Sequence, residues 1–335
     1  MSKVEAQKFA EEDSNLGMAT AIKRRLQQSL AFASLVAIFI FFAFANPAFA
    51  TLSNINGILL STAVIGLLAV GTTFVIITAG IDLSIGTGVT LTAVMTAYAI
   101  KNLGLPVWLG VVVGIVTGAL MGLVNGLNIT YLQLPPFIAT LAMMLIAKGL
   151  ALVISGTAPI YVSGIGNFEE IALGSIVPGW NTPNAVVILF VSAVVASFIL
   201  NRTVLGRYTF AIGSNEEATA ISGINVRKWK IIIYIVGGIF IGLAGVVLTS
   251  RLGSAQPALG MGYELEAIAA VIIGGTSLMG GRGSILGTVI GALIMSVLIN
   301  GLRIMSIQQE WQTVVVGFVI IFAVYTDSLR RRRGL

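Results

Sequence analysis

Few polar side chains interrupt the long apolar stretches of this chain, and these are the residues that could do chemistry. The candidates to line a path across a membrane are Thr78, Asp82, Ser84, Asn125 and Asn128. Hydroxyl and amide groups suit a neutral, hydroxyl-rich solute. A carboxylate at membrane depth costs at least about 2.5 kcal/mol unless it is paired or hydrated. Asp82 is therefore either a pathway group or the N-cap of a helix that begins inside the membrane; its residue type favours the N-cap, and the two roles are compatible.

Catalytic groups are scarce. The 335 residues include no cysteine and no histidine, which removes disulfides, thiolate chemistry and the commonest metal and acid–base side chains. The nearest approach to a phosphate-binding loop runs from Gly275 to Arg282, but it lacks the Lys-Ser/Thr that such a loop requires. We therefore expect no catalytic residue, metal or cofactor in this chain, and no ATP hydrolysis by that mechanism.

The composition points to lipid as the solvent. Hydrophobic residues make up 57% of the chain and charged residues 10%, against roughly 25% charged residues in soluble domains. The net charge of +6 could suggest nucleic acid, but its location argues against that. Lys23, Arg24 and Arg25 precede the first apolar run, and Arg330 to Arg333 follow the last. Basic residues that flank membrane spans mark the cytoplasmic side.

The chain thus reads as an all-α integral membrane protein with both termini cytoplasmic. A single transmembrane domain over 30–328 lies between a cytoplasmic segment 1–29 and a basic tail 329–335. Its first apolar run ends in Ala-Phe-Ala, like a signal peptide, but its length favours a retained helix. The pair of spans around Gly80 could instead be a broken or re-entrant helix. About ten spans are predicted, at 30–50, 57–79, 82–100, 107–129, 136–155, 184–200, 231–250, 264–280, 284–302 and 311–328.

Two loops and two glycine repeats add detail. The loop 201–230 carries five basic residues and is expected inside, whereas the loop 156–183, rich in Gly and Pro, is expected outside, where it could meet a partner. Glycine recurs at every fourth position from Gly110 to Gly126, and again from Gly283 to Gly291. Such strips let helices approach closely, and we expect packing within one bundle rather than a dimer seam or a pore lining.

The loop 201–230 also predicts a short helix from Glu216 to Ser222 that stops at Gly223. Glu216 and Glu217 fall in its first turn, where the helix dipole favours acidic groups. Such a helix could dock another protein or belong to an ordinary structured loop, and the spacing alone does not separate these readings.

Resemblance to a known family separates them. Glu217-Ala218 followed by Gly223 resembles the Glu-Ala-Ala-x-x-x-Gly coupling loop of bacterial ABC importer permeases, with Thr219 in place of the second alanine. Longer stretches resemble the ribose-type (monosaccharide) permease family, in matching order over nearly the whole chain. They are Gly80-Ile-Asp-Leu-Ser-Ile-Gly86, Phe137-Ile-Ala-Thr-Leu-Ala-Met-Met144, Leu205-Gly-Arg-Tyr208, Ser222-Gly-Ile-Asn-Val226, Ser254-Ala-Gln-Pro257, Gly262-Tyr-Glu-Leu-Glu-Ala-Ile-Ala-Ala270 and Gly274-Gly-Thr-Ser277.

The resemblance implies an ABC importer permease fold in a bacterial cytoplasmic (inner) membrane, with a second permease copy or a paralogue, usually a homodimer. It implies ATP-binding subunits that use ATP and Mg and dock at Glu216, Glu217, Ala218 and Gly223. It also implies an external binding protein that delivers ribose or a related sugar. Relatives carry xylose, galactose or autoinducer-2, and more distant ones carry nucleosides or branched-chain amino acids.

The alternative is an ion-coupled secondary transporter of a small polar solute. Such proteins need ion-coordinating or protonatable groups near mid-membrane, and Asp82 is the one strong candidate in the sequence. A membrane enzyme would need a cluster of catalytic polar residues, which the sequence does not offer.

Overall fold

The computed structural model describes residues 29, 31–176 and 182–332, and the fold is mostly helical. An apolar helix Ala31–Ala45 comes first. It is followed by η1 (Pro47–Ala50), α2 (Leu52–Ile77), α3 (Ile85–Lys101), α4 (Val107–Thr130), α5 (Pro136–Ser155), β1 (Ile160–Tyr161), α6 (Glu170–Leu173), α7 (Asn184–Arg202), α8 (Val204–Ser214), α9 (Glu216–Ile221), α10 (Val226–Leu252), β2 (Ser254–Ala255), α11 (Tyr263–Ile273), α12 (Ile285–Ile304) and α13 (Gln309–Arg332).

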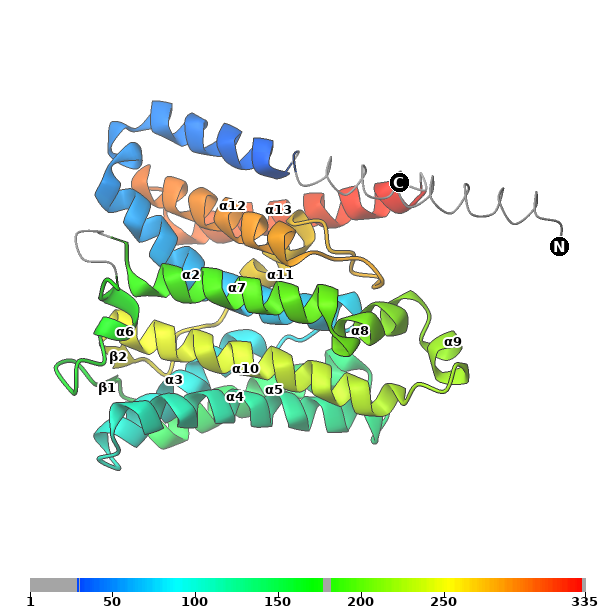
Figure 1. Ribbon diagram of the computed structural model, residues 1–335. Helices are drawn as coiled ribbons and strands as arrows, with labels where there is room; N and C mark the ends of the chain where they lie inside the picture. The colour runs from blue at the N-terminus through cyan, green and yellow to red at the C-terminus, as the bar shows by residue number, and fades with distance from the viewer. Residues whose placement is uncertain (1–28, 30, 177–181, 333–335) are drawn as a thin grey trace.

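The long helices form one bundle with two distinct ends (Figure 1). One end holds α6 and the two-stranded antiparallel pair of β1 with β2, and it is called the sheet end below. The other end holds α8 and α9 and is called the α9 end. The C-terminus of α13 lies toward the α9 end.

Among the described residues, seven helices are long and apolar enough to cross a membrane: α2, α4, α5, α7, α10, α12 and α13. Each of the ten expected spans contains a helix, but the helix Ala31–Ala45, α3 and α11 have only 15, 17 and 11 residues. The expectation for 264–280 was wrong in its second half, because α11 ends at Ile273 and a turn-rich connection follows to Ser284. The glycines there stop the helix. The predicted segment 1–29, with Lys23, Arg24 and Arg25, lies outside the described residues apart from Ser29.

Helix α2 runs through the centre of the bundle and packs against α10, α12, α7 and α11. From Thr62 to Ile77 every residue is buried. Its threonines fit this apolar setting because their hydroxyls return hydrogen bonds to the preceding turn, as Thr72 does to the Leu68 carbonyl at 2.8 Å. Thr73 also bonds across to Thr288 of α12 at 2.8 Å.

The glycine strip of α4 packs against neighbouring helices of the same chain, as expected. A Cβ added at Gly118 would run into the backbone of Gly238 and Gly242 on α10, and one at Gly122 would meet the Tyr234 carbonyl. Gly126 would meet Ile231 Cα at 2.8 Å. The second strip behaves alike, with Gly287 and Gly291 of α12 against α11 and the connection that follows it. Close backbone approach therefore holds these helix pairs together.

Candidate functional site

The connection between α2 and α3 carries Asp82, which is 2% exposed. Its Oδ1 accepts hydrogen bonds from the Ser84 backbone N–H at 2.8 Å and from the Ser84 hydroxyl at 2.6 Å. Ser84, and not Asp82, is the N-cap residue of α3. The preference for Asp82 as the N-cap was therefore off by two residues: the carboxylate fixes the N-cap residue through a short turn instead.

Two helices distant in sequence complete this polar cluster. The Asn125 side-chain amide of α4 donates to the Ser84 hydroxyl at 3.0 Å. The Thr140 hydroxyl of α5 accepts from the Leu83 N–H at 3.1 Å and lies 3.2 Å from the Ile81 carbonyl. The connection is thus held on both sides, as a buried polar backbone requires.

The other two candidates do not join this cluster. Thr78 is buried, but its hydroxyl returns to the Val75 carbonyl at 2.7 Å. Asn128 is half-buried on α4, and its side chain makes no hydrogen bond to the described residues. The candidates therefore divide into a connected set, formed by Asp82, Ser84 and Asn125, and two separate positions.

Sequence reasoning did not select Tyr234 or Thr140 as candidate site residues. Tyr234 of α10 is 2% exposed, and a Cβ added at Gly80 would lie 2.7 Å from its hydroxyl. That hydroxyl and Asn125 Oδ1 are buried without a hydrogen-bond partner among the described residues. Tyr234 sits in an apolar run that reads as core, and only its polar atom could have drawn attention to it.

Replacing Asp82 by alanine is expected to lower the stability of the purified protein by about 1–3 kcal/mol, because the Ser84 N–H and hydroxyl lose their buried acceptor. Asp82→Asn keeps an acceptor oxygen and is expected to retain most of the stability. Thermal unfolding in detergent measures both variants. Equal midpoints for the two would contradict a positioning role for this carboxylate.

The helix predicted in the loop 201–230 is present as α9, and it begins where expected. Asn215 caps it by accepting from the Ala218 N–H at 2.9 Å. Gly223 follows with a φ of +83°, a left-handed conformation that glycine adopts freely. Ile221 is 81% exposed, and Glu217 and Ala218 are exposed beside it.

Helix α8 was not expected, and it fixes α9 to the bundle. The Tyr208 ring of α8 packs edge-on against Trp229 of α10 with centroids 4.8 Å apart. Lys230 of α10 forms an ion pair with Glu216 of α9 at 2.6 Å. The far end of α8 meets the end of α2: a Cβ on Gly213 would collide with the Ile77 carbonyl, which itself accepts from the Gly281 N–H at 2.9 Å.

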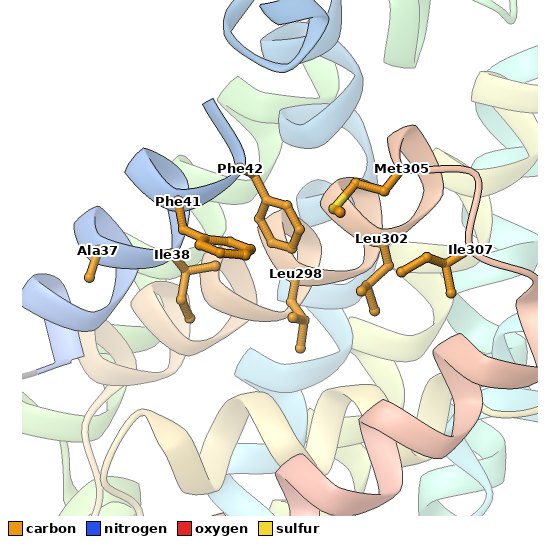
Figure 2. A pocket seen from close by; sticks show the side chains of 8 residues that line it. All are labelled: Ala37, Ile38, Phe41, Phe42, Leu298, Leu302, Met305 and Ile307. Atoms are coloured by element: carbon orange, nitrogen blue, oxygen red, sulfur yellow. The ribbon is translucent and has the colours of Figure 1, made fainter. Parts of the chain in front are cut away.

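One apolar pocket has no polar side chain to bind a solute. It lies between the helix Ala31–Ala45 and α12, with a volume of about 490 Å³ (Figure 2). Phe41 and Phe42 face Leu298 and Leu302 across it. A hydroxyl-rich molecule would lose its hydrogen bonds to water there without replacement, so this pocket is not a site for one. The lining residues are Ala37, Ile38, Phe41, Phe42, Leu298, Leu302, Met305 and Ile307.

Comparison with known proteins gives a consistent family. Residues 54–324 match the family of the branched-chain amino acid transport system / permease component. The ribose import permease protein of Haemophilus influenzae is 40% identical over 314 residues, which cover 92% of this chain and 95% of that protein. The ribose import permease protein of Bacillus subtilis is 44% identical, covering 88% and 91%. The xylose transport system permease protein of Escherichia coli K12 is 34% identical, covering 92% and 93%. No solved structure matches the chain.

Proposed function

The chain belongs to the family of the branched-chain amino acid transport system / permease component, and from this membership we propose that it is the transmembrane permease subunit of an ATP-driven sugar importer. It forms the translocation pathway for ribose or a related small neutral sugar. The sugar class rests on relatives named as ribose and xylose permeases that match over about nine-tenths of the chain. None of these relatives is named as an ion-coupled transporter.

The structure of α9 is the observation that supports an ATP-binding partner. It is short, capped at both ends, anchored by the Lys230–Glu216 ion pair, and exposes Glu217, Ala218 and Ile221 away from the bundle. A capped helix that exposes an acidic residue in its first turn and an apolar residue at its end suits docking into a groove of another protein. We assign it to the ATP-binding subunit, which supplies ATP and Mg²⁺ chemistry outside this chain.

The remaining parts of the assembly follow from the family. The permease is a multi-pass protein, and we place it in the bacterial inner membrane with α9 in the cytoplasm. The helix Ala31–Ala45, α3 and α11 complete ten crossings together with the seven long helices. A second permease copy completes the core, and an external binding protein delivers the sugar at the sheet end. The Asp82 cluster shapes the α2–α3 connection beside the pathway.

The proposal is tested by gentle purification of the tagged chain from its native membrane, with mass spectrometry of what accompanies it. We expect a stoichiometric ATP-binding subunit. The matched control carries Glu217→Lys, which should lose that subunit while keeping the permease itself. A preparation without an ATP-binding subunit that still moves solute in vesicles under an ion gradient would overturn the proposal in favour of a secondary transporter.

A further inference from the structure

The segment between β2 and α11 is not helical, although it runs deep into the bundle. At the sheet end, the Gly253 carbonyl accepts from the Val162 N–H at 2.9 Å, and Ala255 pairs with Ile160 of β1. From there the chain passes through turns at 256–262 until α11 begins at Tyr263. Figure 1 places β2 at one end of the bundle and α11 near its middle.

Contacts along α3 fix how deep the segment reaches. The Thr90 hydroxyl donates to the Leu259 carbonyl, and a Cβ on Gly86 would lie 2.5 Å from the Gly260 carbonyl. The same first turns of α3 lie beside Ile241, which a Cβ on Gly88 would meet at 3.0 Å. Ile241 is close to the middle of the 27-residue helix α10. Gly260 therefore lies near the mid-depth of the bundle.

Three residues of this segment are exposed, at positions 256, 258 and 261. Gln256 is exposed, and its side chain makes no hydrogen bond to the described residues. The N–H groups of Ala258 and Met261, both exposed, donate to no other described group. Hydrocarbon cannot satisfy such groups, so non-helical backbone at membrane depth is found where it is covered by protein or lines water. These polar groups therefore do not face lipid.

A lysine lies against Met261 of this segment. Lys148 of α5 is half-buried, and its Nζ lies 3.2 Å from Sδ of Met261, which is 57% exposed. The residue stands seven positions before the end of α5 at Ser155, or about 10 Å along the helix axis. No carboxylate pairs with it among the described residues, since the sole ion pair there joins Lys230 and Glu216. An unpaired ammonium inside a span marks a water-filled cavity or a solute path.

We propose that Gln256 and Lys148 line the sugar path between the sheet end and mid-membrane and hydrogen-bond the hydroxyl groups of the passing sugar, with the exposed residues of 256–262 forming part of its wall. The inference rests on the proposed function and adds the site to it. The glutamine amide both donates and accepts, and the ammonium donates three hydrogen bonds, which suits a neutral polyhydroxyl ligand. A site of few polar contacts also lets the sugar leave.

Cysteine labelling tests the site directly, because the native chain has no cysteine to interfere. Gln256→Cys and Lys148→Cys permeases, assembled with their ATP-binding subunit in proteoliposomes, are treated with a membrane-impermeant thiol reagent from each side. Ile146→Cys is the matched control, since it lies exposed on another side of α5 at similar depth. We expect modification at positions 256 and 148 to be at least about tenfold faster than at position 146, because the reactive thiolate forms in water. D-ribose delivered by the binding protein should slow it.

Rates at positions 256 and 148 no faster than at 146 would overturn the site. Uptake gives a second readout: Gln256→Leu and Lys148→Met should each lower D-ribose uptake by about tenfold, the value of one lost hydrogen bond. Ile146→Ala should not change it. Unchanged uptake in both variants would also overturn the site. A wild-type complex that carries neither D-ribose nor D-xylose would refute the proposed function instead, while the labelling rates would still report water along 256–262.

Discussion

Gly223→Pro is expected to abolish sugar uptake while the permease stays folded. Gly223 ends the turn after α9 at a φ of +83° and donates its N–H to the Ala220 carbonyl at 3.0 Å. Proline fixes φ near −65° and has no N–H, so the chain cannot leave α9 in its present direction. A Cβ at this position meets nothing within 4 Å, so the bundle itself is not disturbed. Uptake in vesicles and thermal unfolding of the purified variant measure the two effects.

Glu217→Lys tests the same docking surface without a change in the backbone. Glu217 is exposed and makes no ion pair among the described residues, whereas Glu216 is bound to Lys230. Reversed charge at the partner surface costs several kcal/mol, so uptake should fall by about a hundredfold or more. Glu217→Gln keeps the shape and should fall far less. Normal uptake by a well-expressed Glu217→Lys permease would remove α9 from the coupling role.

Gly118→Leu is expected to have the largest effect on stability. The glycine faces backbone atoms of Gly238 and Gly242, which cannot rotate away as a flexible side chain can. Overpacking of this kind costs about 1–3 kcal/mol or more, and here it would separate α4 from α10. The control is Gly57→Ala on α2, where an added Cβ meets nothing within 4 Å and alanine improves helix propensity by about 0.5–1 kcal/mol. Unfolding midpoints that do not differ between these two variants would contradict the role of the strip.

The parts of the fold that the sequence predicted are those set by local pattern. The glycine period in α4 was visible without knowing its partner, and α9 could be placed because its glutamates and Gly223 lie within eight residues of each other. Helix α8 was missed because its residues lie within 201–230, a stretch that was interpreted as a loop from its position after a span and from its basic residues. The apolar run 264–280 was read as one helix, since hydropathy does not register the glycines that end α11.

Only part of the candidate site could be predicted from the sequence, because its residues come from separate segments of the chain. Asp82, Asn125 and Thr140 come from three separate segments, and their contacts through Ser84 and Leu83 depend on how the helices pack. No spacing rule relates residues so far apart in the chain. Gln256 and Lys148 can be read from the sequence as polar residues in or near apolar runs. The depth of the segment 256–262 in the bundle cannot, because it is set by its contacts with Thr90 and Gly86 of α3.

The meeting point of Gly213, Ile77 and Gly281 has a mechanical consequence. Side chains absorb small displacements by changing rotamer, but here main-chain atoms touch main-chain atoms and there is nothing to rearrange. A push on α8 must therefore move the end of α2 by nearly the same amount. Asp82 lies only five residues beyond Ile77. The junction would therefore transmit a displacement of α8, imposed by a partner bound at α9, to the connection between α2 and α3 with little loss.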